Sequence, residues 1–172
     1  VLLKTVREHH PDSYIIYKPH PDVHAGLRVG HIPEQQALEY ANKIELDTSI
    51  LECFKICDEV HTITSLSGFE ALLRGLKVYC YGLPFYAGWG LTQDLHICHR
   101  RQQQLTLEQL VYVSLVEYPV YNIETTEKIR VPLVTPEHVI DYIQPSIRQP
   151  KTHSSSLFTK VFTSFRRLKI RK

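Results

Sequence analysis

The stretch "HTITSLSGFEALLRGLKVYCYG" at residues 61–82 decides the fold. Its pattern predicts a strand that ends at Ile63, a turn rich in hydroxyl groups, a helix that ends at Gly75, and a second strand over 78–81. A helix that connects two short apolar strands is typical of a βα unit, in which both strands run in the same direction. The stretch therefore predicts a parallel sheet.

The same alternation of strands and helices continues on both sides of this stretch. Strands are predicted over residues 13–17, 44–46, 59–63 and 78–81, and helices over 1–10, 33–40, 49–56, 69–74, 105–115 and 135–143. Strands separated by helices are typical of the α/β class. We therefore expect a Rossmann-like parallel sheet with helices on both faces.

The composition is that of an ordinary soluble globular protein, with 43% hydrophobic and 22% charged residues among 172. A chain of this length supports one sizeable domain with its own core. No apolar run approaches the roughly 20 residues that a membrane-spanning helix needs. The chain contains no Met and starts at Val1, so we expect it to be a piece of a longer protein.

The residues that could bind a metal do not form a convincing set. The four cysteines form no CxxC pair, so we expect reduced, mostly buried thiols of a cytosolic protein and no zinc site. His20, Asp22 and His24 have the residue types of a metal site, but their spacing and a proline between them give poor convergence. The sequence therefore predicts no metal.

Charge is distributed unevenly along the chain. Residues 1–141 hold all 18 acidic residues and 12 of the 20 Lys and Arg, whereas residues 142–172 hold 8 Lys and Arg and no acid. We expect a folded lobe over 1–150 and a basic amphipathic tail over 151–172, with apolar residues at helical spacing from Leu157 onward. Such a tail suits an anionic membrane surface. The alternative is that the tail docks on another lobe or is disordered.

The strand over 13–17 ends in an unusual way, in "YIIYKPHPDV" at residues 14–23. Parallel sheets bind their ligands at the carboxyl ends of their strands, so Lys18 and His20 lie where a ligand is expected. Each is followed by a proline, which disfavours helix in the residue before it. A ligand with negative charge would suit this exit from the strand.

The hydroxyl-rich turn after the next long strand predicts an anion site. Thr64, Ser65 and Ser67 crowd the turn, Gly68 allows a ligand to approach the backbone, and the helix that follows presents unpaired N–H groups. Ser67 and Glu70 also fit a capping box, which leaves Thr64 and Ser65 as the better candidates for a ligand. Glu70 could instead accept hydrogen bonds from a ribose hydroxyl pair.

A serine hydrolase is excluded by the same stretch. The nucleophile elbow of these enzymes needs Gly two residues before and two residues after the serine. Ser65 and Phe69 occupy these positions around Ser67, and a phenylalanine would crowd the strained turn.

Three segments together, "YKPHPDV", "GLRVG" and "DEVHTITSLSGFEALLRGLKVYCYGLPFYAGWGLTQD", resemble the capsule polysaccharide biosynthesis family, over about Tyr14 to Asp94. The family contains the bacterial retaining transferases that place β-linked Kdo, an acidic sugar, on a lysophospholipid during capsule export. The resemblance implies the C-terminal, donor-binding half of a GT-B glycosyltransferase that uses CMP-β-Kdo. It implies no further cofactor.

The resemblance also implies roles for individual residues. The pair formed by Lys18 and His20 with the serine turn resembles the motifs by which bacterial sialyltransferases hold CMP. His20 and the turn would then hold the CMP phosphate, with His20 stabilising the leaving group, and Glu70 would hold the ribose. Arg28 would meet the Kdo carboxylate, or is simply exposed.

The loop "LPFYAGWGLTQD" carries several aromatic residues on glycine hinges. Pro84, Phe85 and Tyr86 are candidates for a wall against cytosine or the sugar ring. The alternative is that these side chains pack under the loop as core.

The resemblance also implies partners. The acceptor, a lysophospholipid-linked Kdo, would bind an N-terminal lobe missing from this chain, and the enzyme would lie at the cytoplasmic face of the inner membrane. A nucleic-acid partner is not expected, because the body is acidic and has no recognition motif. The alternative function is a non-catalytic nucleotide-binding or assembly module that is inactive without a partner lobe.

Overall fold

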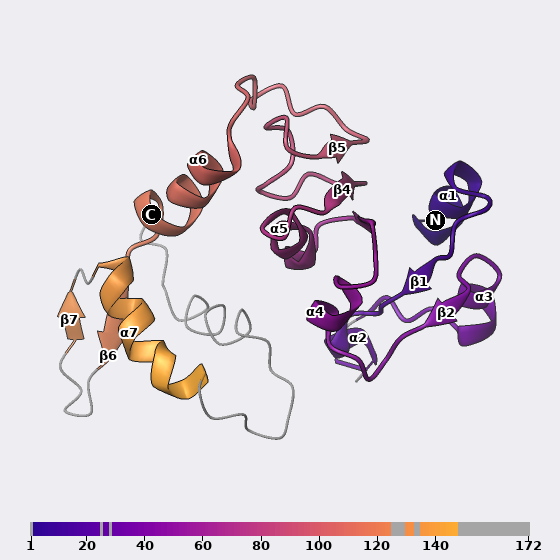
Figure 1. Ribbon diagram of the computed structural model, residues 1–172, viewed down its shortest axis with the longest axis horizontal. Helices are drawn as coiled ribbons and strands as arrows, with labels where there is room; N and C mark the ends of the chain where they lie inside the picture. The colour runs from indigo at the N-terminus through magenta and orange to yellow at the C-terminus, as the bar shows by residue number, and fades with distance from the viewer. Residues whose placement is uncertain (1, 25, 28, 125–129, 133–134, 148–172) are drawn as a thin grey trace. The chain divides into compact units, whose positions relative to one another are not determined.

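The computed structural model describes residues 2–24, 26–27, 29–124, 130–132 and 135–147 (Figure 1). The chain divides into two compact units, Val1–Leu110 and Val111–Lys172. The first unit carries the parallel strands and the residues singled out above. The second begins within a helix.

The first unit alternates short strands with helices. Its elements are α1 (Leu2–His9), β1 (Ile16–Tyr17), α2 (Pro21–His24), α3 (Glu34–Leu38), β2 (Lys43–Ile44), α4 (Ile50–Cys53), β3 (Glu59–Thr62), α5 (Leu66–Leu72), β4 (Lys77–Cys80) and β5 (Gln93–Asp94), and α6 (Leu107–Tyr112) crosses the division. β1 pairs with β2, and β3, β4 and β5 form a second sheet in that order. All of these pairs are parallel. The α/β class predicted from the sequence is confirmed.

The β3–α5–β4 unit forms the centre of the core. Its strands are in register from the Glu59–Lys77 pair to the Thr62–Cys80 pair, and α5 packs against both. Alternate strand residues face α5, so Val78 and Cys80 are only 1% exposed. This is the arrangement that the stretch 61–82 predicted.

Three local features differ from the sequence-based expectations. The strand predicted over 13–17 is reduced to β1, and β5 was not predicted. The segment after Pro19, expected to be an extended loop, forms α2, with Pro21 as its first residue. Proline suits the first turn of a helix because it needs no N–H there.

The second unit contains a π-helical turn (Val113–Glu117), the antiparallel pair β6 (Asn122–Glu124) and β7 (Arg130–Pro132), and α7 (Pro136–Ile147). The helix predicted from Thr135 onward is confirmed as α7. The basic tail over 151–172 lies outside the described residues, so its amphipathic helix stays a prediction. Within the described part of the chain, every helix is too short or too polar to cross a bilayer.

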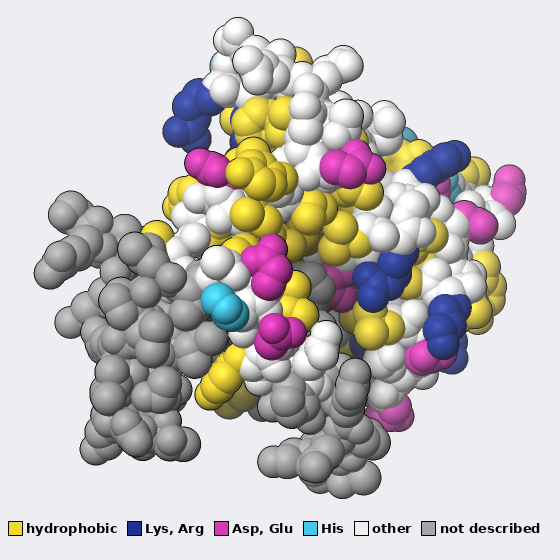
Figure 2. All heavy atoms as spheres, turned by 60° about the vertical axis from the view of Figure 1, so that its left-hand side comes forward, with side chains coloured by type: hydrophobic (Ala, Val, Ile, Leu, Met, Phe, Trp, Pro, Cys, Tyr) yellow, Lys and Arg dark blue, Asp and Glu magenta, His cyan; other side chains and the backbone are white. Residues whose placement is uncertain are grey.

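Many large hydrophobic side chains of the first unit reach the surface. Leu27 is 78% exposed, Ile97 81% and Val29 fully exposed. Figure 2 shows hydrophobic side chains between charged ones on the face that it displays.

Candidate functional site

The candidate residues follow the carboxyl ends of parallel strands. Lys18 and His20 follow β1, the turn from Thr64 to Ser67 follows β3, and the loop with Phe85 follows β4. Because β3 and β4 are parallel and adjacent, the turn and the loop leave the sheet at the same edge.

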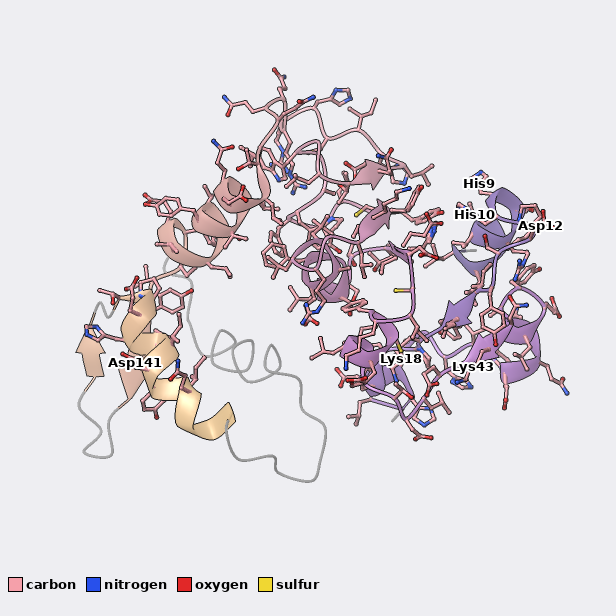
Figure 3. The ribbon with its side chains drawn as sticks, in the orientation of Figure 1. His9, His10, Asp12, Lys18, Lys43 and Asp141 are labelled. Atoms are coloured by element: carbon pink, nitrogen blue, oxygen red, sulfur yellow. The ribbon has the colours of Figure 1, made fainter. Side chains whose placement is uncertain are left out.

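Lys18 is held at the end of the first strand pair. Its Nζ donates a hydrogen bond of 2.7 Å to the carbonyl oxygen of Leu46, which follows β2. Figure 3 shows Lys18 beside α2 and α4, after β1, whereas His10 precedes that strand. The ammonium group of Lys18 keeps two further donors for an anion.

His20 forms the N-terminal cap of α2. Its Nδ1 accepts a hydrogen bond of 3.1 Å from the backbone N–H of Asp22 and lies 3.8 Å from a carboxylate oxygen of Asp22. Since Nδ1 accepts, the neutral ring carries its proton on Nε2. Nε2 is therefore the donor that His20 can offer to a phosphate, and its side chain is 46% exposed.

The hydroxyl-rich turn caps α5 through Ser65. The Ser65 Oγ accepts a hydrogen bond of 3.2 Å from the N–H of Ser67 and donates to the Ser67 Oγ at 3.1 Å. The N–H of Ser65 is in turn held by the Thr62 Oγ1 at 3.1 Å. The prediction that Ser65 is not needed as a cap is wrong, and α5 begins at Leu66, three residues earlier than expected.

Because Ser65 rather than Ser67 caps α5, Ser67 is the better hydrogen-bond donor to a ligand. Its Oγ accepts from Ser65, so the proton of the Ser67 hydroxyl is not used in that bond. Thr64, at the surface of the same turn, offers a second hydroxyl. The capping box predicted between Ser67 and Glu70 does not form.

Gly68 is required by the packing of Tyr86. A Cβ atom at Gly68 would overlap the phenol ring of Tyr86, whose hydroxyl donates to the carbonyl oxygen of Ser65. Tyr86 is fully buried, and this burial raises the pKa of its phenol. The loop after β4 is therefore fastened to the turn after β3.

Of the three loop residues expected to contact the cytosine or the sugar ring, one has an exposed side chain. Pro84 and Tyr86 are buried, which favours the core alternative for them, and their contact with a ligand stays a prediction. Phe85 is 41% exposed and stands edge-on to Phe69, with ring centroids 5.0 Å apart. Phe85 alone of the three presents a surface to a ligand.

Glu70 is a buried carboxylate with an unpartnered oxygen. The residue is 4% exposed, and its Oε2 is the buried side-chain atom without a hydrogen-bond partner among the described residues. Burial raises the pKa of Glu70, and the charge of Arg74 opposes this only in part. Arg74 itself donates to the Glu70 backbone carbonyl, at 2.7 Å.

Two residues that the sequence analysis missed stiffen the glycine-rich loop. The Arg101 Nη1 donates to the carbonyl oxygens of Pro84 at 2.6 Å and Ala87 at 2.7 Å. An Asp94 oxygen accepts from the N–H of Gly88 at 2.7 Å. The left-handed φ of 80° at Gly88 makes this close approach possible, and the glycines of "GWG" were the signal for it.

The structure thus joins some of the predicted site residues directly. Ser65, Ser67, Gly68 and Tyr86 form one connected group. Among the described residues, no hydrogen bond or ion pair links Lys18 or His20 to this group. Arg28 lies outside the described residues.

Comparison with known proteins agrees with the resemblance carried by the sequence motifs. Residues 1–125 match the family described as "Capsule polysaccharide biosynthesis protein". The capsule polysaccharide modification protein LipA of Neisseria meningitidis serogroup B is 59% identical over 120 residues, which is 70% of this chain and 17% of LipA. The chain therefore spans about a sixth of the length of this relative.

Two solved structures share the fold. The β-Kdo 2,7 transferase of Thermosulfurimonas dismutans KpsC matches with a TM-score of 0.70 and 40% identity, covering 86% of this chain and 46% of that one. The β-Kdo 2,4 transferase of KpsC matches with a TM-score of 0.64 and 27% identity, over 83% and 43%. The likeness confirms the predicted fold class, the Rossmann-like half of a GT-B glycosyltransferase. On the match over 1–125, the chain belongs to the capsule polysaccharide biosynthesis family.

Proposed function

We propose that this chain is the donor-binding half of a retaining β-Kdo transferase, which transfers Kdo from CMP-β-Kdo to a β-Kdo linker on a lysophospholipid. The likeness to two KpsC Kdo transferases supports the sugar. The chain covers less than half of each of those structures, so the acceptor and the catalytic carboxylate needed for retention would lie elsewhere in the whole protein.

The observation that carries the proposal is the unpartnered oxygen of Glu70. A buried carboxylate oxygen without a hydrogen-bond donor is costly, and such atoms are uncommon in folded proteins. Glu70 lies one helical turn beyond the hydroxyl-rich turn of β3, where the nucleotide is expected. The two hydroxyl groups of a ribose would supply the donors that the carboxylate lacks.

The phosphate of the donor would contact groups that can all donate hydrogen bonds. Lys18, the Nε2 of His20 and the hydroxyls of Thr64 and Ser67 are the candidates, while Ser65 holds the turn in shape. Cleavage of the bond to Kdo leaves negative charge on the CMP phosphate. Donors already in place would stabilise that charge without reorganisation, and His20 is the proposed catalytic residue of this half.

Two further contacts complete the proposed donor site. Arg28 would pair with the Kdo carboxylate through its guanidinium group, and Phe85 would cover the cytosine or the sugar. No cofactor is required, since CMP carries a single phosphate group whose charge these donors can balance.

The whole protein would work at the cytoplasmic face of the inner membrane, as a peripheral enzyme. The lipid-linked acceptor requires it to reach a bilayer, and the basic tail over 151–172 would bind anionic lipids at about 1 kcal/mol for each Lys or Arg near the surface.

A non-catalytic nucleotide-binding or assembly module is the second candidate. The side chains of Leu27, Val29 and Ile97 are exposed and would be available to a partner lobe. One experiment separates the two candidates. Kdo transfer from CMP-Kdo is measured with this chain alone, with the N-terminal part of the full-length protein, and with both.

The transferase proposal expects transfer with both parts and none with either alone. It also expects His20→Asn to abolish that transfer, whereas His24→Asn, on the same short helix, leaves it unchanged. Binding of CMP without transfer in the combined sample would favour the module instead.

A further inference from the structure

We propose that His10, Glu59 and His61 form a binding site for a divalent late transition metal ion, with zinc as the expected occupant. One ligand atom from each residue lies within 4.8 Å of the other two. Two imidazoles and a carboxylate are a ligand set that zinc accepts, with water in the fourth position.

The distances between the ligand atoms fit a tetrahedral ion. The His61 Nε2 lies 3.2 Å from the Glu59 Oε1, and the His10 Nδ1 lies 3.5 Å from the same oxygen. Ligand bonds of about 2.0–2.1 Å in a tetrahedron place neighbouring ligand atoms about 3.3–3.4 Å apart. The Glu59 oxygen thus already has, to both ring nitrogens, about the spacing that an ion would require.

The orientation of His61 is fixed by its neighbours on the sheet. Its ring stacks on Tyr79, with centroids 4.5 Å apart and planes 5° from parallel. Its Nδ1 lies 3.1 Å from the hydroxyl of Tyr81, which can donate or accept. When Nε2 binds a metal, Nδ1–H can donate to Tyr81, which is the support that metal-binding histidines usually have.

The third ligand comes from a distant part of the chain. His10 immediately follows α1, beside the labelled His9 in Figure 3, and its ring stands edge-on to His61 at 5.1 Å. Glu59 and His61 are two residues apart on β3, so their side chains share one face of the strand. A bound ion would fasten the end of α1 to β3 and would stabilise the folded state.

This site is separate from the proposed donor site. Glu59 begins β3, whereas the hydroxyl-rich turn follows the carboxyl end of that strand, after Thr62. The sequence analysis predicted no metal, because Glu59 and His61 resemble ordinary strand residues and their partner His10 is far away in sequence. The partial burial of the group, at 26%, 28% and 12% exposed for the His10, Glu59 and His61 side chains, distinguishes it from a solvated ion pair.

The test is a titration of the 172-residue chain, without a histidine tag, with Co²⁺ followed by visible absorption, and then displacement by Zn²⁺. The site predicts one equivalent of bound Co²⁺, with the spectrum of nitrogen and oxygen ligands and no sulfur-to-cobalt charge-transfer band. Glu59→Gln and His10→Ala should each weaken binding more than about 100-fold, because removal of a direct ligand exceeds the effect of a supporting residue.

Matched variants control for folding. His9→Ala removes an exposed histidine beside His10 and should leave the Co²⁺ affinity and the Zn²⁺-induced rise in melting temperature unchanged. Tyr81→Phe should weaken Co²⁺ binding about tenfold. The proposal is overturned if the folded wild-type chain binds no Co²⁺, or if His10→Ala retains the wild-type affinity and spectrum with an unchanged circular dichroism spectrum.

Discussion

At the scale of single residues, Glu70 makes the most specific prediction about stability. Because burial raises the pKa of Glu70, the folded chain holds that proton more tightly than the unfolded chain does. The free energy of unfolding therefore falls as the pH rises from the unfolded pKa through the folded one. Above that range, each unit of raised pKa costs about 1.4 kcal/mol.

Glu70→Gln should accordingly stabilise the ligand-free chain at pH 8, and the gain should shrink as the pH is lowered. Urea denaturation at several pH values measures this. Glu39→Gln, at an exposed carboxylate, serves as the control and should change little. If Glu70→Gln destabilises the chain equally at all pH values, the carboxylate has a partner in the native protein, and the ribose proposal loses its main support.

Gly68 makes a second prediction at this scale. Gly68→Ala should lower the free energy of unfolding by about 1–3 kcal/mol, as overpacking of a core does, since the new methyl group overlaps the Tyr86 ring. Gly75→Asn is the comparison. Gly75 has a φ of 75° and open space around it, and asparagine tolerates that conformation. Equal stability of wild type and Gly68→Ala would contradict the packing described.

The sequence indicated which residues gather at the turn but not how each one is used. Thr64, Ser65 and Ser67 were placed correctly after a strand, because hydroxyl-rich turns have a local signature. The cap is Ser65 rather than Ser67, a difference of two residues that the local pattern does not resolve. The burial of Tyr86 depends on a glycine 18 positions earlier in the chain.

At the scale of elements, α5 depends on its cap. Ser65→Ala removes the side-chain acceptor for the Ser67 N–H and should cost about 1 kcal/mol of stability, the usual value for an N-terminal cap. Ser67→Ala leaves that acceptor in place and should cost less, while it weakens nucleotide binding more. Chemical denaturation and CMP titration of both variants measure the two effects. The reverse order of stability would mean that Ser67 caps the helix.

The β3–α5–β4 unit was predictable from sequence because its strands carry β-branched and aromatic residues, its helix is bounded by a polar turn and Gly75, and its contacts are local. The two-residue strands were predicted less well, since β1 was expected over 13–17 and β5 was not expected. β1 and β5 have two residues each, and such strands exist only because a neighbouring strand pairs with them. α2 is a single helical turn, closed by backbone bonds to the His20 carbonyl and capped by the His20 ring, and its sequence has no hydrophobic periodicity that would predict it.

At the scale of the whole molecule, the chain has the fold of one half of a GT-B glycosyltransferase. The motifs that carried the family resemblance lie at the carboxyl ends of strands, which is why the sequence alone led to the prediction of a nucleotide site. The group of His10, Glu59 and His61 could not be predicted, because it forms only when α1 and β3 meet.

The central claim is that this chain binds the CMP part of the sugar donor through His20 and the turn after β3. Calorimetric titration with CMP tests it most directly, using the wild-type chain and His20→Asn, which keeps the cap of α2 because asparagine is a good N-terminal cap. The account predicts that CMP binds one to one, that His20→Asn weakens binding at least about tenfold, by 1.4 kcal/mol, and that the melting temperature of the variant is unchanged. A folded wild-type chain that does not bind CMP, or a His20→Asn variant that binds it as tightly as wild type, would contradict the account.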